Sequence, residues 1–157
     1  MTYGEDTSPE TLQPSQFPGK SIKINHIAIV VPDLQEATAF WVDALGLPLE
    51  RVSEVPQEAV RVAFLPAGEG VIELLQPLDE ESGVARYMKK QGPGLHHLCL
   101  EVEDIEAAMA RLRAYDVELI NERPRVSDDG LRKYAFIHPQ SAGGVLVELY
   151  EMAVTDQ

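Results

Sequence analysis

Hydrophobic and polar residues alternate along residues 21–31, where isoleucine and valine are frequent, and this pattern predicts a β-strand. Pro32 ends the strand. Asp33, with Glu36 three residues later, is typical of a helix N-terminus. Apolar residues at helical spacing then continue to Gly46, which is placed to end the helix. The chain is therefore expected to open with a strand and a helix that covers one face of it.

The same succession of elements recurs further along the chain. Strands are expected at 47–55, 60–66 and 70–76, a connecting helix at 78–90, a strand at 95–102, a helix capped by Asp104, and strands at 118–125, 132–138 and 144–151. A strand, a helix and three strands thus occur twice, which predicts an α+β fold of two βαβββ repeats. Each repeat has one sheet face covered by its helix and one open face. Pairing of the two repeats would form a curved mixed sheet around a sheltered cup.

The duplication is also visible in the residues. Residues 25–34 are echoed 71 positions later by residues 96–105, and residues 63–75 are matched by residues 135–150. Each copy opens with a strand that carries one histidine and closes with a strand that carries one glutamate. A pseudo-twofold arrangement that brings two histidines and two carboxylates together is typical of a metal site.

The alternation of side chains along the strands predicts where these four residues point. His26 and His97 alternate with large aliphatic residues, which belong on the face packed against a helix, so both histidines are expected to face away from it. Glu73 and Glu148 lie inside otherwise apolar strands. Because an unpaired buried carboxylate is costly, each needs a partner such as a cation. The four side chains can therefore share the cup.

Simpler interpretations compete with this one. A histidine in a strand is commonly hydrogen-bonded or half-exposed, and a glutamate in an edge strand commonly faces solvent; recurrence at matching positions in both repeats favours the metal site. The other polar candidates are weaker. His96 has the parity of the packed face and is expected to be structural, whereas His138 suits a loop. Cys99 is expected to be a small filler without a neighbouring base, and Lys89 with Lys90 a solvated helix end.

Length and composition limit the domain organisation. With 157 residues, 45% of them hydrophobic, the chain fits one compact domain. We expect a disordered leader at 1–21, where polar residues and proline dominate, and a domain at 22–152. Within this domain, repeat one is expected at 22–78, a linker helix at 79–92 and repeat two at 93–152.

Charge and cysteine content narrow the range of partners. The formal net charge of −13 argues against nucleic acid as a partner. No run of 18 apolar residues is present, so no membrane span is expected. The one cysteine, Cys99, excludes an internal disulfide framework and suits a reducing cytoplasm.

Several segments resemble a known family. These segments are residues 61–66, 72–78, 92–98, 101–108 and 138–149, within a resemblance that extends from about residue 23 to residue 151. They are similar to the methylmalonyl-CoA epimerase family of the vicinal oxygen chelate (glyoxalase/bleomycin resistance/dioxygenase) superfamily. The His-His segment and the segment from His138 to Leu149 carry most of the specificity, since the four histidines and glutamates alone would not separate an epimerase from a glyoxalase.

The resemblance implies a site and a reaction. It implies one divalent metal ion, cobalt in the first place, with nickel, manganese or zinc as alternatives, held by His26, Glu73, His97 and Glu148. It also implies epimerisation at C2 of methylmalonyl-CoA, in propionyl-CoA metabolism, by proton abstraction and return through a metal-stabilised enolate. Glu148 is the first candidate for the acid/base group and Glu73 the second. An acyl-CoA substrate and a homodimer are further expectations from the family.

Two departures from the family pattern keep other functions open. Val62 occupies a position where some relatives carry a glutamate considered to be a base, and Gln140 stands where many relatives have lysine. The alternatives are a glyoxalase-like lyase or isomerase acting on a glutathione hemithioacetal, and a non-catalytic module of the same fold that sequesters a ligand.

Overall fold

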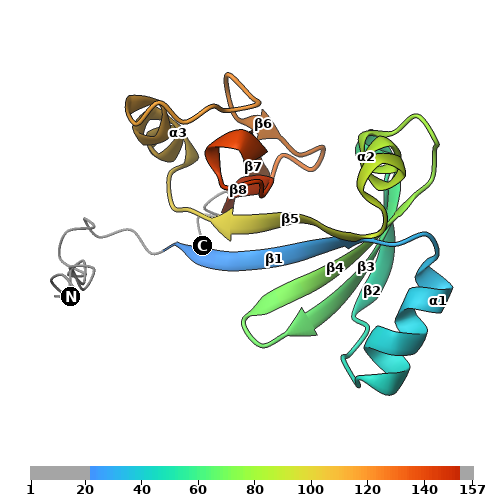
Figure 1. Cartoon of the computed structure of the whole chain (residues 1–157). Coiled ribbons are helices and arrows are strands. Elements are labelled where there is room, and N and C mark those ends of the chain that lie inside the picture. The colour runs from blue at the N-terminus through green and yellow to red at the C-terminus, as the bar shows by residue number, and fades with distance from the viewer. Residues whose placement is uncertain (1–21, 153–157) are drawn as a thin grey trace, which may run out of the picture.

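The computed structural model describes residues 22–152, so the leader expected at 1–21 lies outside the described residues. Eight strands form a single sheet in the order β2-β3-β4-β1-β5-β8-β7-β6. The sheet curves, and its middle strands β1 and β5 lie side by side between the two halves (Figure 1). This arrangement confirms the predicted α+β fold with a curved mixed sheet.

The described elements follow the predicted order. They are β1 (Lys23–Val30), α1 (Leu34–Thr38), the π-helix η2 (Ala39–Ala44), β2 (Arg51–Val55), the 3-10 turn η3 (Pro56–Glu58), β3 (Val60–Ala67), β4 (Gly70–Pro77), α2 (Gly83–Gln91), β5 (Gly94–Glu101), α3 (Ile105–Ala114), β6 (Arg125–Val126), β7 (Arg132–Ile137), the 3-10 turn η4 (Pro139–Ser141) and β8 (Val147–Met152).

The two halves of the sheet have the same internal pairing. β1 is parallel to β4 in the first half, and β5 is parallel to β8 in the second. Within each half the outer strands pair antiparallel. β1 and β5 pair antiparallel with each other, which joins the halves into one sheet within one chain.

Helices α1 and α3 cover the outer face of the sheet, whereas α2 packs through Val84 at one end of the inner face, beside the space that is available for a site. Asp33 accepts a hydrogen bond from the Glu36 backbone N–H at 2.9 Å, which confirms the predicted start of α1. Leu34 of α1 packs with Leu65 and Leu74 from the outer face of the first half. Met109 of α3 packs in the same way in the second half, in a separate cluster of buried residues.

Four predicted boundaries were wrong, and the strand expected at 144–151 is one of them, because β8 begins only at Val147. The strand expected at 118–125 is reduced to the two residues of β6, because Asn121 takes the place of a ladder partner: its Oδ1 accepts from the Phe136 backbone N–H at 2.8 Å. The helix expected at 78–90 begins only at Gly83, because the Ser82 hydroxyl caps it. The strand expected at 47–55 begins at Arg51, since the Leu47 backbone N–H still donates to the Trp41 carbonyl of η2 at 3.0 Å.

No helix among residues 22–152 combines the length and the apolar character needed to cross a membrane.

Candidate metal centre

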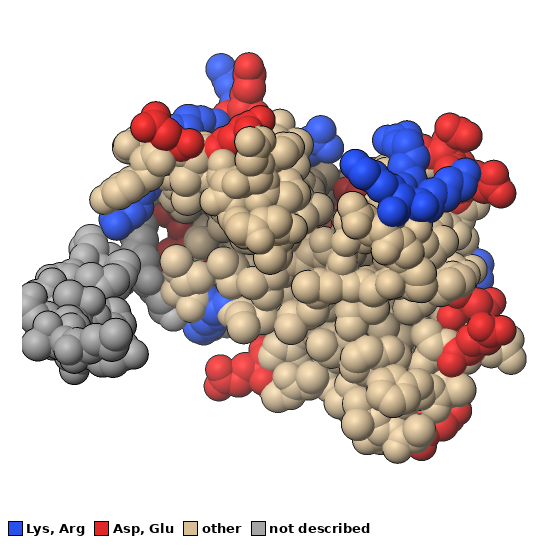
Figure 2. All heavy atoms as spheres, viewed as in Figure 1, with Lys and Arg blue, Asp and Glu red and all other residues tan. Residues whose placement is uncertain are grey.

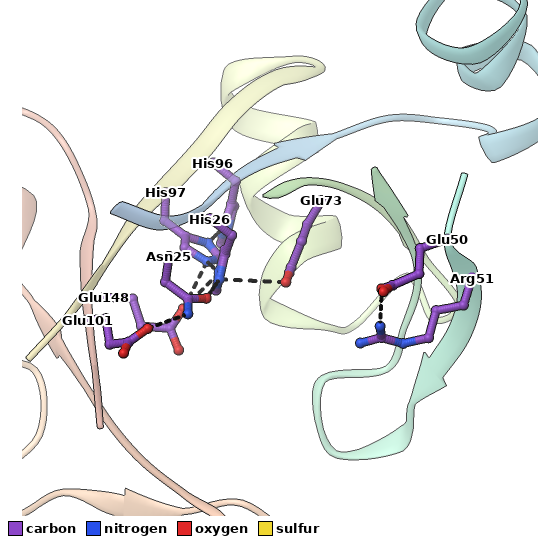
Figure 3. Close-up of polar contacts among 9 residues, drawn as sticks. All are labelled: Asn25, His26, Glu50, Arg51, Glu73, His96, His97, Glu101 and Glu148. Carbon is purple, nitrogen blue, oxygen red and sulfur yellow. Dashed lines mark hydrogen bonds and ion pairs between the residues drawn. The ribbon is translucent and has the colours of Figure 1, made fainter. Parts of the chain in front are cut away.

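Four neighbouring strands each contribute one of the predicted residues to the inner face of the sheet. β4, β1, β5 and β8 are adjacent in this order and carry Glu73, His26, His97 and Glu148 respectively. Both histidines are buried, and the two glutamate side chains are 17% and 12% exposed. The side chains point toward one another (Figure 3). The parity argument therefore placed all four on the correct face.

Three donor atoms converge at one place in the cup. The Nε2 atoms of His26 and His97 are 3.0 Å apart, and Oε2 of Glu148 lies 3.3 Å from the first and 3.0 Å from the second. Two donors about 2.1 Å from a first-row metal ion and at right angles to each other are separated by about 3.0 Å. The donor spacing and the mixture of imidazole and carboxylate therefore fit a divalent cation.

The fourth predicted donor lies beside this triangle. Oε1 of Glu73 is 3.5 Å from Nδ1 of His26, the ring nitrogen that faces away from the convergence point. The structure thus brings three of the four predicted donors together at their donor atoms and places the Glu73 carboxylate against the far nitrogen of one of them.

The two carboxylates experience different electrostatic surroundings. Burial alone would raise the pKa of Glu148, but hydrogen bonds with His26 and His97 outweigh it and lower the pKa to about 2. Burial raises the pKa of Glu73 above its ordinary value, and the charge of His26 opposes this only in part. Glu148 is therefore a firmly ionised donor, whereas Glu73 takes up a proton more readily.

His26 lies between the two carboxylates, and both of them raise its pKa. Burial lowers the pKa of His26, but its hydrogen bond with Glu148 and the negative charges of Glu73 and Glu148 outweigh burial, so the net change is upward. This corner of the cup therefore attracts positive charge, which is the electrostatic condition for a cation site.

Cys99 lies closer to the donors than the sequence indicated. Its Sγ is within 4.8 Å of donor atoms of His26 and Glu148. The residue is completely buried, and burial strongly raises the pKa of its thiol, with the nearby negative charge of Glu148 adding to the effect. The distance from Sγ to these atoms makes Cys99 a further candidate donor, and its role as a small filler beside the donors stays a prediction.

The expectation for His96 was wrong. His96 lines the cup together with His97, although the two are consecutive in the strand. The pairing of β5 with β1 skips His96, since Ala28 is opposite His97 and Ile29 is opposite Leu95. Such a β-bulge places two consecutive side chains near one face of a sheet. Burial and the charge of His97 lower the pKa of His96 to about 4, so its ring is neutral near pH 7.

The cup extends from the donors into a cavity of about 200 Å³ with two unlike walls. One wall is aliphatic and includes Val60, Val62 and Leu75 from β3 and β4. The opposite wall comes from β7 and β8 and includes Arg132 and Tyr150, with the guanidinium carbon 6.0 Å from the tyrosine ring centre. Burial raises the pKa of Tyr150 to about 12, which keeps its hydroxyl protonated as a donor.

Sequence reasoning missed Arg132 and Tyr150 as cup residues. The signal was present, because Arg132 alternates with Lys133 and Tyr150 shares the parity of Glu148. Arg132 is the one lysine or arginine among the described residues that line this cavity. Its position opposite the aliphatic wall gives the cup a fixed positive charge in addition to any bound cation.

Comparisons with known proteins agree with this geometry. Residues 25–136 match the model of the glyoxalase/bleomycin resistance protein/dioxygenase superfamily. The human mitochondrial methylmalonyl-CoA epimerase is 38% identical over 128 residues, which are 81% of this chain and 72% of that protein.

Two solved structures are similar over most of their length. The methylmalonyl-CoA epimerase of Mycobacterium tuberculosis has a TM-score of 0.74 at 38% identity, covering 83% of this chain and 87% of that one. A methylmalonyl-CoA epimerase in complex with methylmalonyl-CoA and NH4+ has a TM-score of 0.74 at 28% identity, covering 85% and 96%. With its fold, its duplicated halves and these similarities, the chain belongs to the glyoxalase/bleomycin resistance protein/dioxygenase superfamily and, within it, to the methylmalonyl-CoA epimerase family.

Proposed function

We propose that this protein interconverts the two C2 epimers of methylmalonyl-CoA, in propionyl-CoA metabolism. One observation carries the proposal: the donor atoms of His26, His97 and Glu148 converge within 3.3 Å of one another at one end of a cavity that also holds Arg132. The relatives named methylmalonyl-CoA epimerase support the substrate.

The chemistry requires positive charge near the acyl group. The C2 proton lies between a thioester carbonyl and a carboxylate and is too weakly acidic for a side chain to remove unaided. A divalent cation held by His26, His97 and Glu148, with Glu73 alongside, supplies charge that stabilises the developing enolate. We propose cobalt as this cation, on the resemblance to the family and because mixed imidazole and carboxylate donors suit first-row metals, which include nickel, manganese and zinc.

Epimerisation takes a proton from one face of C2 and returns one to the other, so two acid/base groups are needed. We assign these roles to Glu148 and Glu73, which reach the cup from opposite halves of the sheet. The raised pKa of Glu73 suits a group that holds and releases a proton. Val62 and Phe64 leave the cup face of β3 apolar near them, and Glu58, which also lines the cavity, is exposed to solvent.

Two basic groups suit the charged ends of the substrate. Arg132, across the cup from the aliphatic wall, can bind the free carboxylate of the acyl group. A cavity of about 200 Å³ is smaller than the roughly 300–1,000 Å³ of typical ligand pockets, so it encloses the acyl end and leaves the nucleotide outside. Lys and Arg side chains gather over α2 (Figure 2), which includes Lys89 and Lys90 and contributes Val84 to the cup. We assign the phosphates of CoA to this basic end.

The remaining proposals concern organisation. We propose that residues 22–152 work as one domain in a homodimer, for which the exposed apolar residues Ile22, just before β1, and Ile24, within β1, offer contact surface. A cytoplasmic location is supported by the free, buried Cys99.

Deuterium exchange tests the function. The cobalt-loaded protein is incubated in heavy water with one epimer of methylmalonyl-CoA, and we expect deuterium at C2 together with formation of the other epimer. Turnover of the methylglyoxal–glutathione adduct without exchange at C2 would instead favour a glyoxalase. Absence of both activities and of bound metal would favour a binding module.

A further inference from the structure

A β-bulge lies immediately before each of the two candidate ligand histidines, His26 and His97, in the pairing of β1 with β5. Between β1 and β5, Ile24 is opposite Leu100 and His26 is opposite Cys99, so Asn25 has no partner across the strands. The same pairing skips His96 immediately before His97. Asn25 and His96 are 71 positions apart, as are the two histidines that follow them. The bulges therefore occupy equivalent places in the two repeats.

The side chain of each bulge residue contacts the ring that follows it. Oδ1 of Asn25 is 2.9 Å from Nδ1 of His26, and Nδ1 of His96 is 2.8 Å from Nδ1 of His97 (Figure 3). In both cases the contact is made to the ring nitrogen that faces away from the convergence point. The nitrogens that face this point are the two Nε2 atoms.

Glu101 acts through Asn25 to determine which ring nitrogen of His26 carries a hydrogen. Nδ2 of Asn25 donates to Oε2 of Glu101 at 3.1 Å. An ionised carboxylate can only accept, so the amide nitrogen must face Glu101 and the amide oxygen must face His26. The Asn25 oxygen then requires a hydrogen on Nδ1 of His26. In the metal-free cup Nε2 of His26 lies against Oε2 of Glu148 at 3.3 Å and shares a hydrogen with it. When a cation takes the place of that hydrogen, the hydrogen on Nδ1 remains and Nε2 offers its lone pair to the cation.

His97 has a corresponding contact on its Nδ1, with His96 as the partner in place of an asparagine. If Nε2 of His97 is to bind a cation, its hydrogen must sit on Nδ1 and be donated to the lone pair of His96 Nδ1. Tyr87 packs against the His96 ring and fixes its orientation toward His97. The two rings pack edge to face at 4.7 Å between centres, and the Tyr87 hydroxyl donates to the Leu95 carbonyl at 2.6 Å.

We propose that Asn25 and His96 are positioning residues that hold His26 and His97 in the Nδ1–H tautomer, with Nε2 directed at the cation. The inference rests on the proposed cation site. The bulges are the device that makes it possible, because a regular strand would point the residue before each histidine to the opposite face of the sheet. The duplicated scaffold thus supplies two different acceptors, an amide oxygen and an imidazole nitrogen, for the same task.

The test compares variants that remove the acceptor with variants that keep one. Asn25→Leu and His96→Leu delete the acceptor, whereas Asn25→Asp and His96→Asn retain an acceptor atom near the same place. Cobalt affinity is measured by titration calorimetry, and the tautomers of His26 and His97 are read from nitrogen-15 NMR of the protein loaded with diamagnetic zinc. His138→Leu, outside the cup, is the matched control.

We expect each leucine variant to lose about 10- to 100-fold in cobalt affinity and to shift the tautomer of the adjacent histidine. The acceptor-retaining variants should recover most of both, and the control should resemble the wild type. Leucine variants with wild-type affinity and tautomers would overturn the inference alone. A wild-type protein that binds no cobalt would overturn it together with the proposed cation site. Weakened binding in the leucine variants of a protein without epimerase activity would uphold it while the proposed function fails.

Discussion

The two halves of the sheet have the same pairing but make unequal contributions to the cup. The second half contributes Glu148, which lies against both Nε2 atoms and has its pKa lowered to about 2. The first half contributes Glu73, which lies against Nδ1 of His26 and has its pKa raised. Equivalent positions in a duplicated chain have therefore acquired different protonation behaviour.

The walls differ in the same way. The first half presents aliphatic side chains such as Val62 and Leu75, whereas the second presents Arg132, Tyr134 and Tyr150. A symmetric scaffold is sufficient to collect donors around a cation. A substrate with a methyl group on one side of its reacting carbon and a carboxylate on the other needs an asymmetric cup. The symmetry between the two halves therefore accounts for the cation site. The different side chains on the two walls account for selectivity between the methyl group and the carboxylate of the substrate.

The largest expected effect comes from Glu148. Glu148→Gln removes the anion shared by His26 and His97, so bound cobalt should fall to near zero in metal analysis, and epimerase activity should fall by roughly 10³-fold or more. Circular dichroism should show a folded protein. Glu54→Gln, an exposed change in the first half, is the control. Full activity with retained metal would contradict the assignment of Glu148.

Glu73→Gln provides the direct comparison between the halves. Because Glu73 lies beside the converging donors, this variant should keep its cobalt, with affinity lowered by about tenfold, and lose about 10²–10³-fold in kcat through the missing proton carrier. Metal analysis and deuterium exchange at C2 separate the two effects. If Glu73→Gln lost metal as completely as Glu148→Gln, the two carboxylates would be equivalent and the asymmetry would be refuted.

Arg132 tests the polar wall. Arg132→Gln should raise KM for methylmalonyl-CoA by about 10- to 100-fold, the loss expected for a hydrogen bond between charged groups, and leave cobalt binding unchanged. Arg61→Gln is a well-matched control, because the two arginine side chains are 42% and 43% exposed, each has one acidic partner, and Arg61 lies outside the cup. Equal KM values for the two variants would remove Arg132 from the binding of the carboxylate.

The smallest expected effect concerns α2. Changing Lys89 and Lys90 to glutamate should raise KM about two- to fivefold at low salt, because exposed charges act weakly on a ligand and are screened by ions. The difference from wild type should shrink at high ionic strength, while kcat stays constant. A rise in KM that did not depend on salt would argue against phosphate contacts at this end of the helix.

Several features of the site required more than the sequence. The strand expected at 118–125 was wrong because a side chain, Asn121, replaced part of the backbone pairing. His96 was assigned to the packed face because parity arguments assume regular strands, and the bulge in β5 breaks that regularity. The position of Arg132 was open to the same parity argument that placed His97, but no repeat in the first half drew attention to it.

The sequence by itself determined the duplicated order of elements and the face on which His26, Glu73, His97 and Glu148 lie, because alternation along a strand is a local property of the chain. Only the tertiary structure decided the register of β1 against β5, which pairs residues about 71 positions apart. That register creates the bulges, turns Nε2 of each histidine toward the other, and places one carboxylate at the convergence point and the other beside it. Such choices depend on contacts between distant segments, which no local pattern contains.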